Sequence, residues 1–340
     1  MKVRKSLQTF ETSLGARIYQ IPVEVFPGFW SFAYLVKYED YLVLIDVGSG
    51  IGDCNTQLIS GIEEIGSIES GQSITLNEFT HVLITHGHFD HFGGLAFIKP
   101  KTKAVIGIHE LDRKNITNYE ERRALVANKL EEYFIQAGVP PKDIENLIDL
   151  YRLFKQLFHS VPVDFTYEAI GMHLGPFEFM YVPGHCAGHV IIRLHDVLFC
   201  GDHILSEITP HQSPEQITSW TGLGHYLQSL DAMAGWAEKS NLALCGHNDT
   251  VIDLPTRIAE IQDMHQDRLE KVLDFFKSPK TINDLAHSLF ADANGYNALL
   301  AIEEAGAHVE YLYQRGNLKI ENFDELEMTD QPLTYYYTRQ

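Results

Sequence analysis

One short stretch of the sequence narrows the choice of fold more than any other. Three histidines and an aspartate lie within six residues, in the string HGHFDH at residues 86–91. A β-branched, apolar run at 80–85 precedes the string, and this pattern predicts a strand that ends in a polar turn. Imidazole and carboxylate groups crowded into one space compete for partners unless a metal ion binds them. The string therefore predicts a metal site at a strand end, where α/β enzymes carry their chemistry.

Three later elements of the chain repeat this arrangement. Residues 183–189 read PGHCAGH, residues 200–203 read CGDH, and residues 245–248 read CGHN. Each follows an apolar run that predicts a strand, and in each a glycine precedes the polar side chain, which lets the backbone approach a site closely. His185, Asp202 and His247 are therefore candidates for the same metal site.

These four elements, in this order, resemble the metallo-β-lactamase-fold hydrolase superfamily, and the resemblance covers about residues 15–250. It implies an α/β fold, a four-layer αββα sandwich. It also implies two metal ions, and a hydroxide that bridges them and attacks the substrate. The first metal is expected on His86, His88 and His185, and the second on Asp90, His91 and His247, with Asp202 bridging both; Asp90 and Asp202 are the implied catalytic residues.

Two further residues are expected to support these ligands. Asp46, in the string LIDVG, corresponds to an aspartate that accepts a hydrogen bond from a ligand histidine and so fixes its tautomer. The alternative for Asp46 is a turn or helix-cap aspartate. His189 begins a predicted strand, and we expect it to support the site without binding metal. For His203 two interpretations stay open: its side chain faces the pocket, or it only packs in the core.

The expected ligands favour zinc as the cofactor. All are imidazole nitrogens or carboxylate oxygens, which suit zinc and would also suit iron or manganese. A metal-held water has its pKa lowered from ~16 towards ~7, which supplies hydroxide at neutral pH. The four cysteines lie far apart with no CxxC pair, so we interpret them as reduced and not as a thiolate zinc site.

Composition along the chain predicts two domains, a catalytic domain at 1–254 and a small domain at 255–340. Within the first, apolar residues at helical spacing over about 113–160, interrupted by Pro140 and Pro141, predict a helical insertion. Beyond Pro255 the pattern predicts three helices and a brief extended segment, which resembles the winged-helix appendage of lactamase-like hydrolases and endoribonucleases. A helix N-cap is expected at Thr281 with Asp284.

That appendage leaves two functions open. The first is hydrolysis of a small-molecule ester, thioester or lactone, and the alternative is an endoribonuclease or phosphodiesterase with the same dinuclear site. A formal charge of −20, with eight basic against fifteen acidic residues in 255–340, disfavours nucleic acid and favours a small-molecule substrate. A homodimer is expected from size and composition alone.

The sequence also predicts where the protein works. It has no apolar run approaching the ~20 residues of a membrane helix. The first thirty residues have no apolar stretch typical of an export signal. We therefore expect a cytoplasmic protein without a membrane partner.

Overall fold

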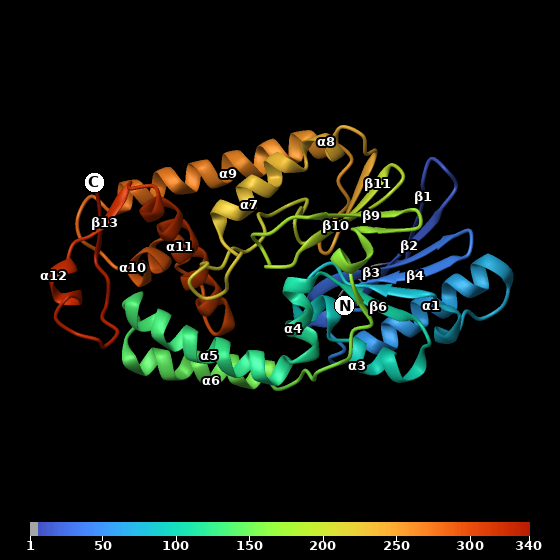
Figure 1. The fold of residues 1–340 in the computed structure, drawn as a ribbon, viewed down its shortest axis with the longest axis horizontal. Helices are drawn as coiled ribbons and strands as arrows, with labels where there is room; N and C mark the ends of the chain where they lie inside the picture. Colours follow the sequence, from blue (N-terminus) through green and yellow to red (C-terminus); the bar gives the residue numbers. More distant parts are fainter. Residues whose placement is uncertain (1–5) are drawn as a thin grey trace.

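The computed structural model describes residues 6–340, and two β-sheets form its centre (Figure 1). The first sheet has its seven strands in chain order. Strands β1 to β4 pair antiparallel as a meander, and β4 to β7 pair parallel. The strands are β1 (Gln8–Glu11), β2 (Arg17–Phe26), β3 (Phe29–Tyr38), β4 (Tyr41–Ile45), β5 (His81–Leu83), β6 (Val105–Ile108) and β7 (Phe165–Thr166).

The second sheet has five strands in the order β12-β11-β10-β9-β8. Its neighbours pair antiparallel except β11 and β12, which are parallel. The strands are β8 (His173–Leu174), β9 (Phe177–Tyr181), β10 (Val190–Leu194), β11 (Val197–Gly201) and β12 (Leu242–Cys245). Because β5, β11 and β12 end at the same side of the sandwich, the polar turns that follow them converge.

Apolar residues are buried on both faces of each sheet, so each sheet also needs a covering layer on its outer face, which gives four layers. Between the sheets, residues such as Val36 and Ile45 pack with Phe179 and Ile192. The outer face of the first sheet packs on α1 (Cys54–Ser70), α2 (Phe89–Phe92) and α3 (Leu95–Ile98). The outer face of the second sheet packs on α7 (Leu223–Ala232), α8 (Ala234–Ala237) and α9 (Leu254–Phe275). The expected αββα sandwich is confirmed.

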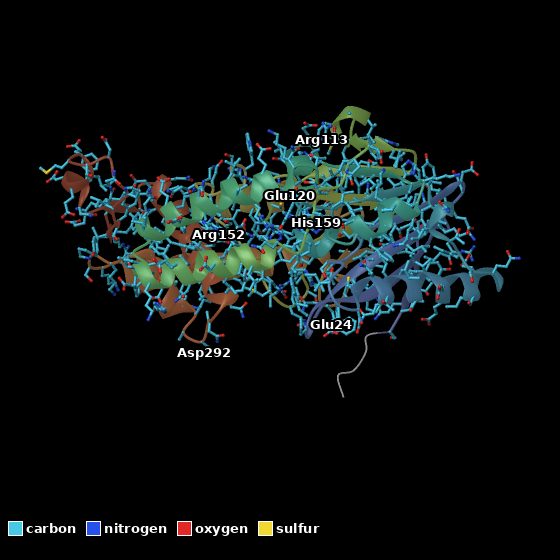
Figure 2. The ribbon with its side chains drawn as sticks, turned by 90° about the horizontal axis from the view of Figure 1, so that it is seen from below. Glu24, Arg113, Glu120, Arg152, His159 and Asp292 are labelled. Atoms are coloured by element: carbon cyan, nitrogen blue, oxygen red, sulfur yellow. The ribbon has the colours of Figure 1, made fainter. Side chains whose placement is uncertain are left out.

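A helical insertion leaves the first sheet after β6. It comprises α4 (Glu110–Thr117), α5 (Tyr119–Gln136) and α6 (Pro141–Lys155), with the break at Pro140 where the sequence predicts it. Figure 2 shows α5 and α6 side by side, with charged side chains such as Glu120 and Arg152 on the outside. The insertion thus has one solvent-exposed face and one face that can pack against the rest of the protein.

The chain ends in three helices, of which α10 and α11 contact this insertion. They are α10 (Ile282–Leu289), α11 (Tyr296–Gln314) and α12 (Phe323–Leu326), with a ribbon of β13 (Leu318–Ile320) and β14 (Tyr337–Arg339). The expected cap forms, since Thr281 and Asp284 make a reciprocal capping box at the start of α10. Apolar residues of α5, α6, α9, α10 and α11 form one continuous core with the second sheet. The division at residue 254 and the winged-helix assignment remain predictions.

Among the helices of residues 6–340, none combines the length and the apolar character that crossing a bilayer requires.

Candidate metal centre

Three histidines from two distant loops form a first cluster. His86 and His88 follow β5, and His185 lies in the loop between β9 and β10. Each offers a ring nitrogen within 4.8 Å of the others, and His86 Nε2 lies 3.1 Å from His88 Nδ1. Three neutral nitrogens converging on one point match a transition-metal site with room for solvent.

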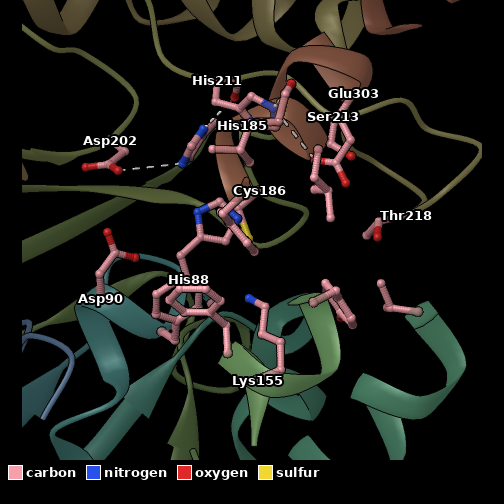
Figure 3. A pocket seen from close by; sticks show the side chains of 18 of the residues that line it. His88, Asp90, Lys155, His185, Cys186, Asp202, His211, Ser213, Thr218 and Glu303 are labelled. Atoms are coloured by element: carbon pink, nitrogen blue, oxygen red, sulfur yellow. Dashed lines mark hydrogen bonds and ion pairs between the residues drawn. The ribbon is translucent and has the colours of Figure 1, made fainter. Parts of the chain in front are cut away.

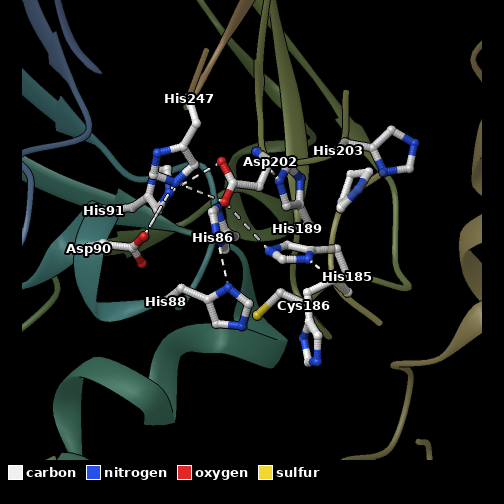
Figure 4. A network of polar contacts seen from close by, with 12 residues as sticks. His86, His88, Asp90, His91, His185, Cys186, His189, Asp202, His203 and His247 are labelled. Carbon is white, nitrogen blue, oxygen red and sulfur yellow. Dashed lines mark hydrogen bonds and ion pairs between the residues drawn. The ribbon is translucent and has the colours of Figure 1, made fainter. Parts of the chain in front are cut away.

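A second cluster of four lies beside the first (Figure 4). It joins Asp90 and His91 of α2 to Asp202 after β11 and His247 after β12, again within 4.8 Å. Asp202 Oδ1 lies 3.3 Å from His91 Nε2, and Asp202 Oδ2 lies 3.2 Å from His247 Nε2. Its Oδ2 also lies 3.7 Å from His185 Nε2 of the first cluster. The carboxylate of Asp202 therefore stands between the two clusters.

Outward hydrogen bonds fix the orientation of the imidazole rings. The Nδ1 of His185 contacts the carbonyl oxygen of His211 at 2.7 Å, and that of His247 contacts the carbonyl oxygen of Trp30 at 2.7 Å. Because a carbonyl can only accept, Nδ1 carries a proton and Nε2 is the nitrogen that faces inward. Among the described residues, the buried Nε2 atoms of His91 and His185 and Oδ1 of Asp202 have no hydrogen-bond partner. Nitrogen and oxygen atoms that face inward without a hydrogen-bond partner are suited to bind a metal ion.

Asp46 lies beneath the second cluster. Its Oδ2 lies 2.9 Å from Nδ1 of His91 and accepts from the Thr85 hydroxyl at 2.8 Å, while its Oδ1 accepts from the Thr85 backbone N–H at 2.8 Å. The residue is fully buried and has a positive φ of 56°, a conformation that strains a non-glycine residue. Its position follows from β4, which ends at Ile45 and directs the next residue under α2.

The two clusters differ in their electrostatics. Burial lowers the pKa of His86, His88 and His185, so these rings are neutral, as metal ligands must be. Burial also opposes the charged form of His247, but the carboxylates of Asp202 and Asp90 outweigh it and raise its pKa to about 10. The second cluster therefore pairs carboxylates with protonated rings, whose protons a metal would displace.

Close backbone packing makes this crowding feasible. A Cβ on Gly246 would collide with the Asp202 carboxylate and with the His91 ring. The Gly246 N–H also donates to the carbonyl oxygen of Gly201 at 2.6 Å, which ties the β11 and β12 turns together. A glycine before His247 is therefore a steric requirement of the site.

The remaining sequence-predicted residues lie around the two clusters. His189 stacks on His86 with ring centroids 4.6 Å apart, and its Nε2 accepts the Asp202 backbone N–H at 3.1 Å. His203 is fully buried behind the site and does not line the pocket. The Cys186 thiol donates a hydrogen bond to the Asp112 carboxylate at 3.1 Å, a contact that sequence reasoning missed.

A cavity of about 790 Å³ opens over the two clusters (Figure 3). The insertion, α11 and the 205–221 segment line it together with five cluster residues, His88, Asp90, His185, Asp202 and His247. Most of its lining is apolar and comes from Phe26, Phe29, Leu130, Tyr151, Phe154 and Leu299. Phe154 of α6 lines the cavity, whereas Phe134 of α5 lies in the core.

Lys155 is a pocket residue that sequence reasoning missed. It ends α6, and Figure 3 shows its ammonium group directed into the cavity. The group lies 3.9 Å from the centroid of the Phe89 ring, and the ion pairs of the described residues do not include it. Burial lowers the pKa of Lys155 to about 8. The signal available in sequence was its spacing four residues after Tyr151, which places both on one face of the helix.

Comparison with known proteins agrees with this geometry. The family model described as "Metallo-beta-lactamase superfamily" matches residues 28–274. A metallo-beta-lactamase family protein from Thermus thermophilus has 24% identity and a TM-score of 0.72, with 95% of this chain and 98% of that chain covered. A Beta-lactamase domain protein from Burkholderia ambifaria has 19% identity and a TM-score of 0.70, with 98% and 95% covered.

A curated relative gives a more specific comparison. The protein named "Hydroxyacylglutathione hydrolase" from Shewanella sp. (strain ANA-3) is 26% identical over 200 residues, which is 57% of this chain and 57% of that relative's length.

The family match extends over most of the chain, and the site has two clusters of His and Asp side chains that could hold metal ions. The chain belongs to the metallo-beta-lactamase superfamily.

Proposed function

We propose that this protein is a dinuclear-metal-dependent hydrolase of a small-molecule ester, thioester or lactone that also carries an anionic group. The observation that carries the proposal is the mainly apolar cavity beside both clusters, with the Lys155 ammonium directed into it. Pockets of about 300–1,000 Å³ with few polar groups are typical of small-molecule sites. The name of the Shewanella relative, which denotes hydrolysis of an acylated glutathione, supports a thioester among these substrates.

The residues present fit two divalent cations, for which we propose zinc. His86, His88 and His185 would hold one, and Asp90, His91 and His247 the other, with Asp202 shared. Two cations in such a site supply an activated water and polarise the substrate carbonyl. We propose that Asp90, at the cavity wall, accepts a hydrogen bond from the attacking water and orients it. Phe29, whose ring centroid lies 4.5 Å from that of His247, shields this side from solvent.

Charge in the cavity supports an anionic substrate. Away from the ligands, Lys155, Arg122 and Arg123 face it with Glu303 as the opposing carboxylate. Arg122 is held by Asn115 and Thr218, each at 3.1 Å. The Lys155 ammonium contacts aromatic rings and forms no ion pair with the described residues, and the carboxylates of Asp90 and Glu303 act on it only from farther away. Desolvating an ammonium that has no carboxylate within ion-pair distance is unfavourable, and a substrate carboxylate or phosphate would reduce that cost.

The test is a hydrolysis panel on metal-reconstituted protein. It contains thioesters, aryl esters and lactones as matched pairs with and without a carboxylate, together with a phosphodiester and a structured RNA. We expect carboxylate-bearing esters or thioesters to be turned over best. Lys155→Met should raise KM for the anionic member of a pair about 10-fold and leave the neutral member unchanged.

Arg152→Met is the matched control, because Arg152 is an exposed cation on the same helix. It should leave both substrates unaffected. Hydrolysis of RNA alone, or an equal effect of Lys155→Met on neutral and anionic substrates, would overturn the proposal.

A further inference from the structure

One peptide bond links the candidate ligand His185 to a helix of the C-terminal region. The carbonyl oxygen of His211 accepts from His185 Nδ1 at 2.7 Å (Figure 3). The N–H of Gln212, which belongs to the same peptide unit, donates to Glu304 Oε2 at 2.6 Å. A carboxylate, an amide and an imidazole thus form one continuous hydrogen-bonded chain that ends at the inward-facing Nε2 of His185.

The amide in the middle of this chain transmits more than position. Resonance couples the N–H and C=O of a peptide unit, so a negative charge at the N–H makes the carbonyl oxygen a stronger acceptor. A stronger acceptor at Nδ1–H holds the ring in one tautomer and raises the basicity of the opposite nitrogen. Carboxylates that contact a ligand histidine directly act in the same way, and here the effect passes through a peptide bond.

Glu304 is itself held in place for this contact. It lies in α11 with 7% of its surface exposed, and its Oε1 accepts from Arg268 of α9 at 2.6 Å. Burial opposes its charged form, but the basic groups around it lower the pKa of Glu304, so it is ionised. The same helix accepts the His211 ring, whose Nε2 donates to the Leu300 carbonyl at 3.0 Å. Both sides of the 211–212 peptide are therefore attached to α11.

Glu304 also lies with His265 and His308 in a buried trio whose ligand atoms are within 4.8 Å of one another. The hydrogen bonds disfavour a metal there. Both carboxylate oxygens already accept from Arg268 and Gln212, and the guanidinium group repels a second cation. His308 Nδ1 donates to the Glu304 carbonyl and its Nε2 lies 3.2 Å from His265 Nδ1, so the trio makes internal hydrogen bonds.

We propose that Glu304 is a positioning residue for the metal centre, acting on His185 through the 211–212 peptide. Helix α11 thereby sets the metal affinity of the first cluster. This inference rests on the proposed metal site, in which His185 is a ligand.

Glu310 provides a matched control on the same helix. Its carboxylate accepts from the backbone N–H groups of Glu215 at 2.8 Å and Gln216 at 3.1 Å, in the same loop. Those peptide units carry the carbonyls of Pro214 and Glu215, and among the described residues neither carbonyl contacts a metal-cluster histidine. Glu310→Gln therefore weakens the attachment of the loop without touching the chain to His185.

The experiment compares Glu304→Gln with Glu310→Gln in full-length protein. Glutamine keeps the size of the side chain and an acceptor oxygen, but removes the charge. In competition with a chromophoric zinc chelator, Glu304→Gln should weaken one of the two zinc equivalents about 10-fold and Glu310→Gln less than about twofold. Nitrogen-15 NMR adds a direct readout, because the His185 Nδ1–H and Gln212 amide protons should both shift upfield only in Glu304→Gln.

The outcomes separate this inference from the proposed function. If wild-type protein binds no zinc, the metal site itself fails. If wild type binds two equivalents and Glu304→Gln matches it, or if Glu310→Gln loses as much affinity, the relay alone is overturned. Should Glu304→Gln fold poorly because Arg268 loses its partner, the double variant with Arg268→Met removes that unpaired charge, and the same loss of zinc affinity is expected.

Discussion

Replacing Asp46 by asparagine tests how the second cluster is organised. The carboxylate lies within hydrogen-bond distance of the Thr85 N–H, the Thr85 hydroxyl and His91 Nδ1. An asparagine can keep its oxygen on the Thr85 N–H, but its NH₂ group then faces His91. The ring must turn its Nδ1 lone pair outward and carry its proton on Nε2, the atom that would bind metal.

The expected loss can be worked from that single contact. A hydrogen bond to a charged group contributes about 1.5–3 kcal/mol. Since about 1.4 kcal/mol is tenfold in affinity, the second metal should bind roughly 10–100-fold more weakly. The assay is competition with a chelator at fixed pH, together with the metal content of the purified protein.

Thr85→Val is the control for this change. It removes the hydroxyl's hydrogen bond to the same carboxylate and its 3.1 Å contact with His86 Nδ1 in the first cluster, but it leaves the His91 contact. The affinity for the second metal should therefore fall less than about threefold. If Asp46→Asn binds metal within about twofold of wild type, the tautomer argument is refuted and Asp46 is a structural turn residue.

Two further changes test packing and protonation. Gly246→Ala should place a methyl group against Asp202 and His91, lower the free energy of unfolding by about 1–3 kcal/mol and reduce the bound metal. The control is Gly235→Ala, where an added Cβ meets no atom within 4 Å, and it should leave thermal unfolding unchanged. Equal behaviour of the two variants would contradict the steric argument. Burial lowers the pKa of His265 to about 3, so its contribution to stability is present above pH 6.5 and is lost as pH falls towards 3. In urea unfolding of the metal-loaded protein, this group should lower the free energy of unfolding by about 2 kcal/mol between pH 7 and pH 5. His265→Gln should remove that part of the pH dependence. The same pH dependence in wild type and His265→Gln would contradict the prediction.

The sequence predicts the metal-rich turns well because their signals are local. A strand pattern followed by HGHFDH, or a Thr281 cap three residues before Asp284, places its residues without reference to the rest of the chain. Strands such as β7 and β8, each two residues long, escape prediction because they exist only through pairing with distant neighbours. The local sequence pattern does not indicate which distant strands they pair with.

Pocket and relay residues are missed for a related reason. Lys155 belongs to a helix whose sequence is ordinary, and its role follows from where α6 lies relative to α2. The His211 carbonyl is a backbone atom, so no residue type marks it. Glu304 has the appearance of a solvated helix residue until α9 and the 205–221 segment cover it. Such roles are set by tertiary packing and not by local pattern.

The most direct test of the account is the metal content of the reconstituted protein, measured by elemental analysis beside Asp202→Ala. Asp202 contacts both clusters, so the account predicts two divalent ions per wild-type chain, reduced occupancy of both positions in the variant, and loss of most hydrolytic activity. Wild-type protein that never takes up more than a trace of metal, or a variant that keeps two ions and near-normal turnover, would contradict it.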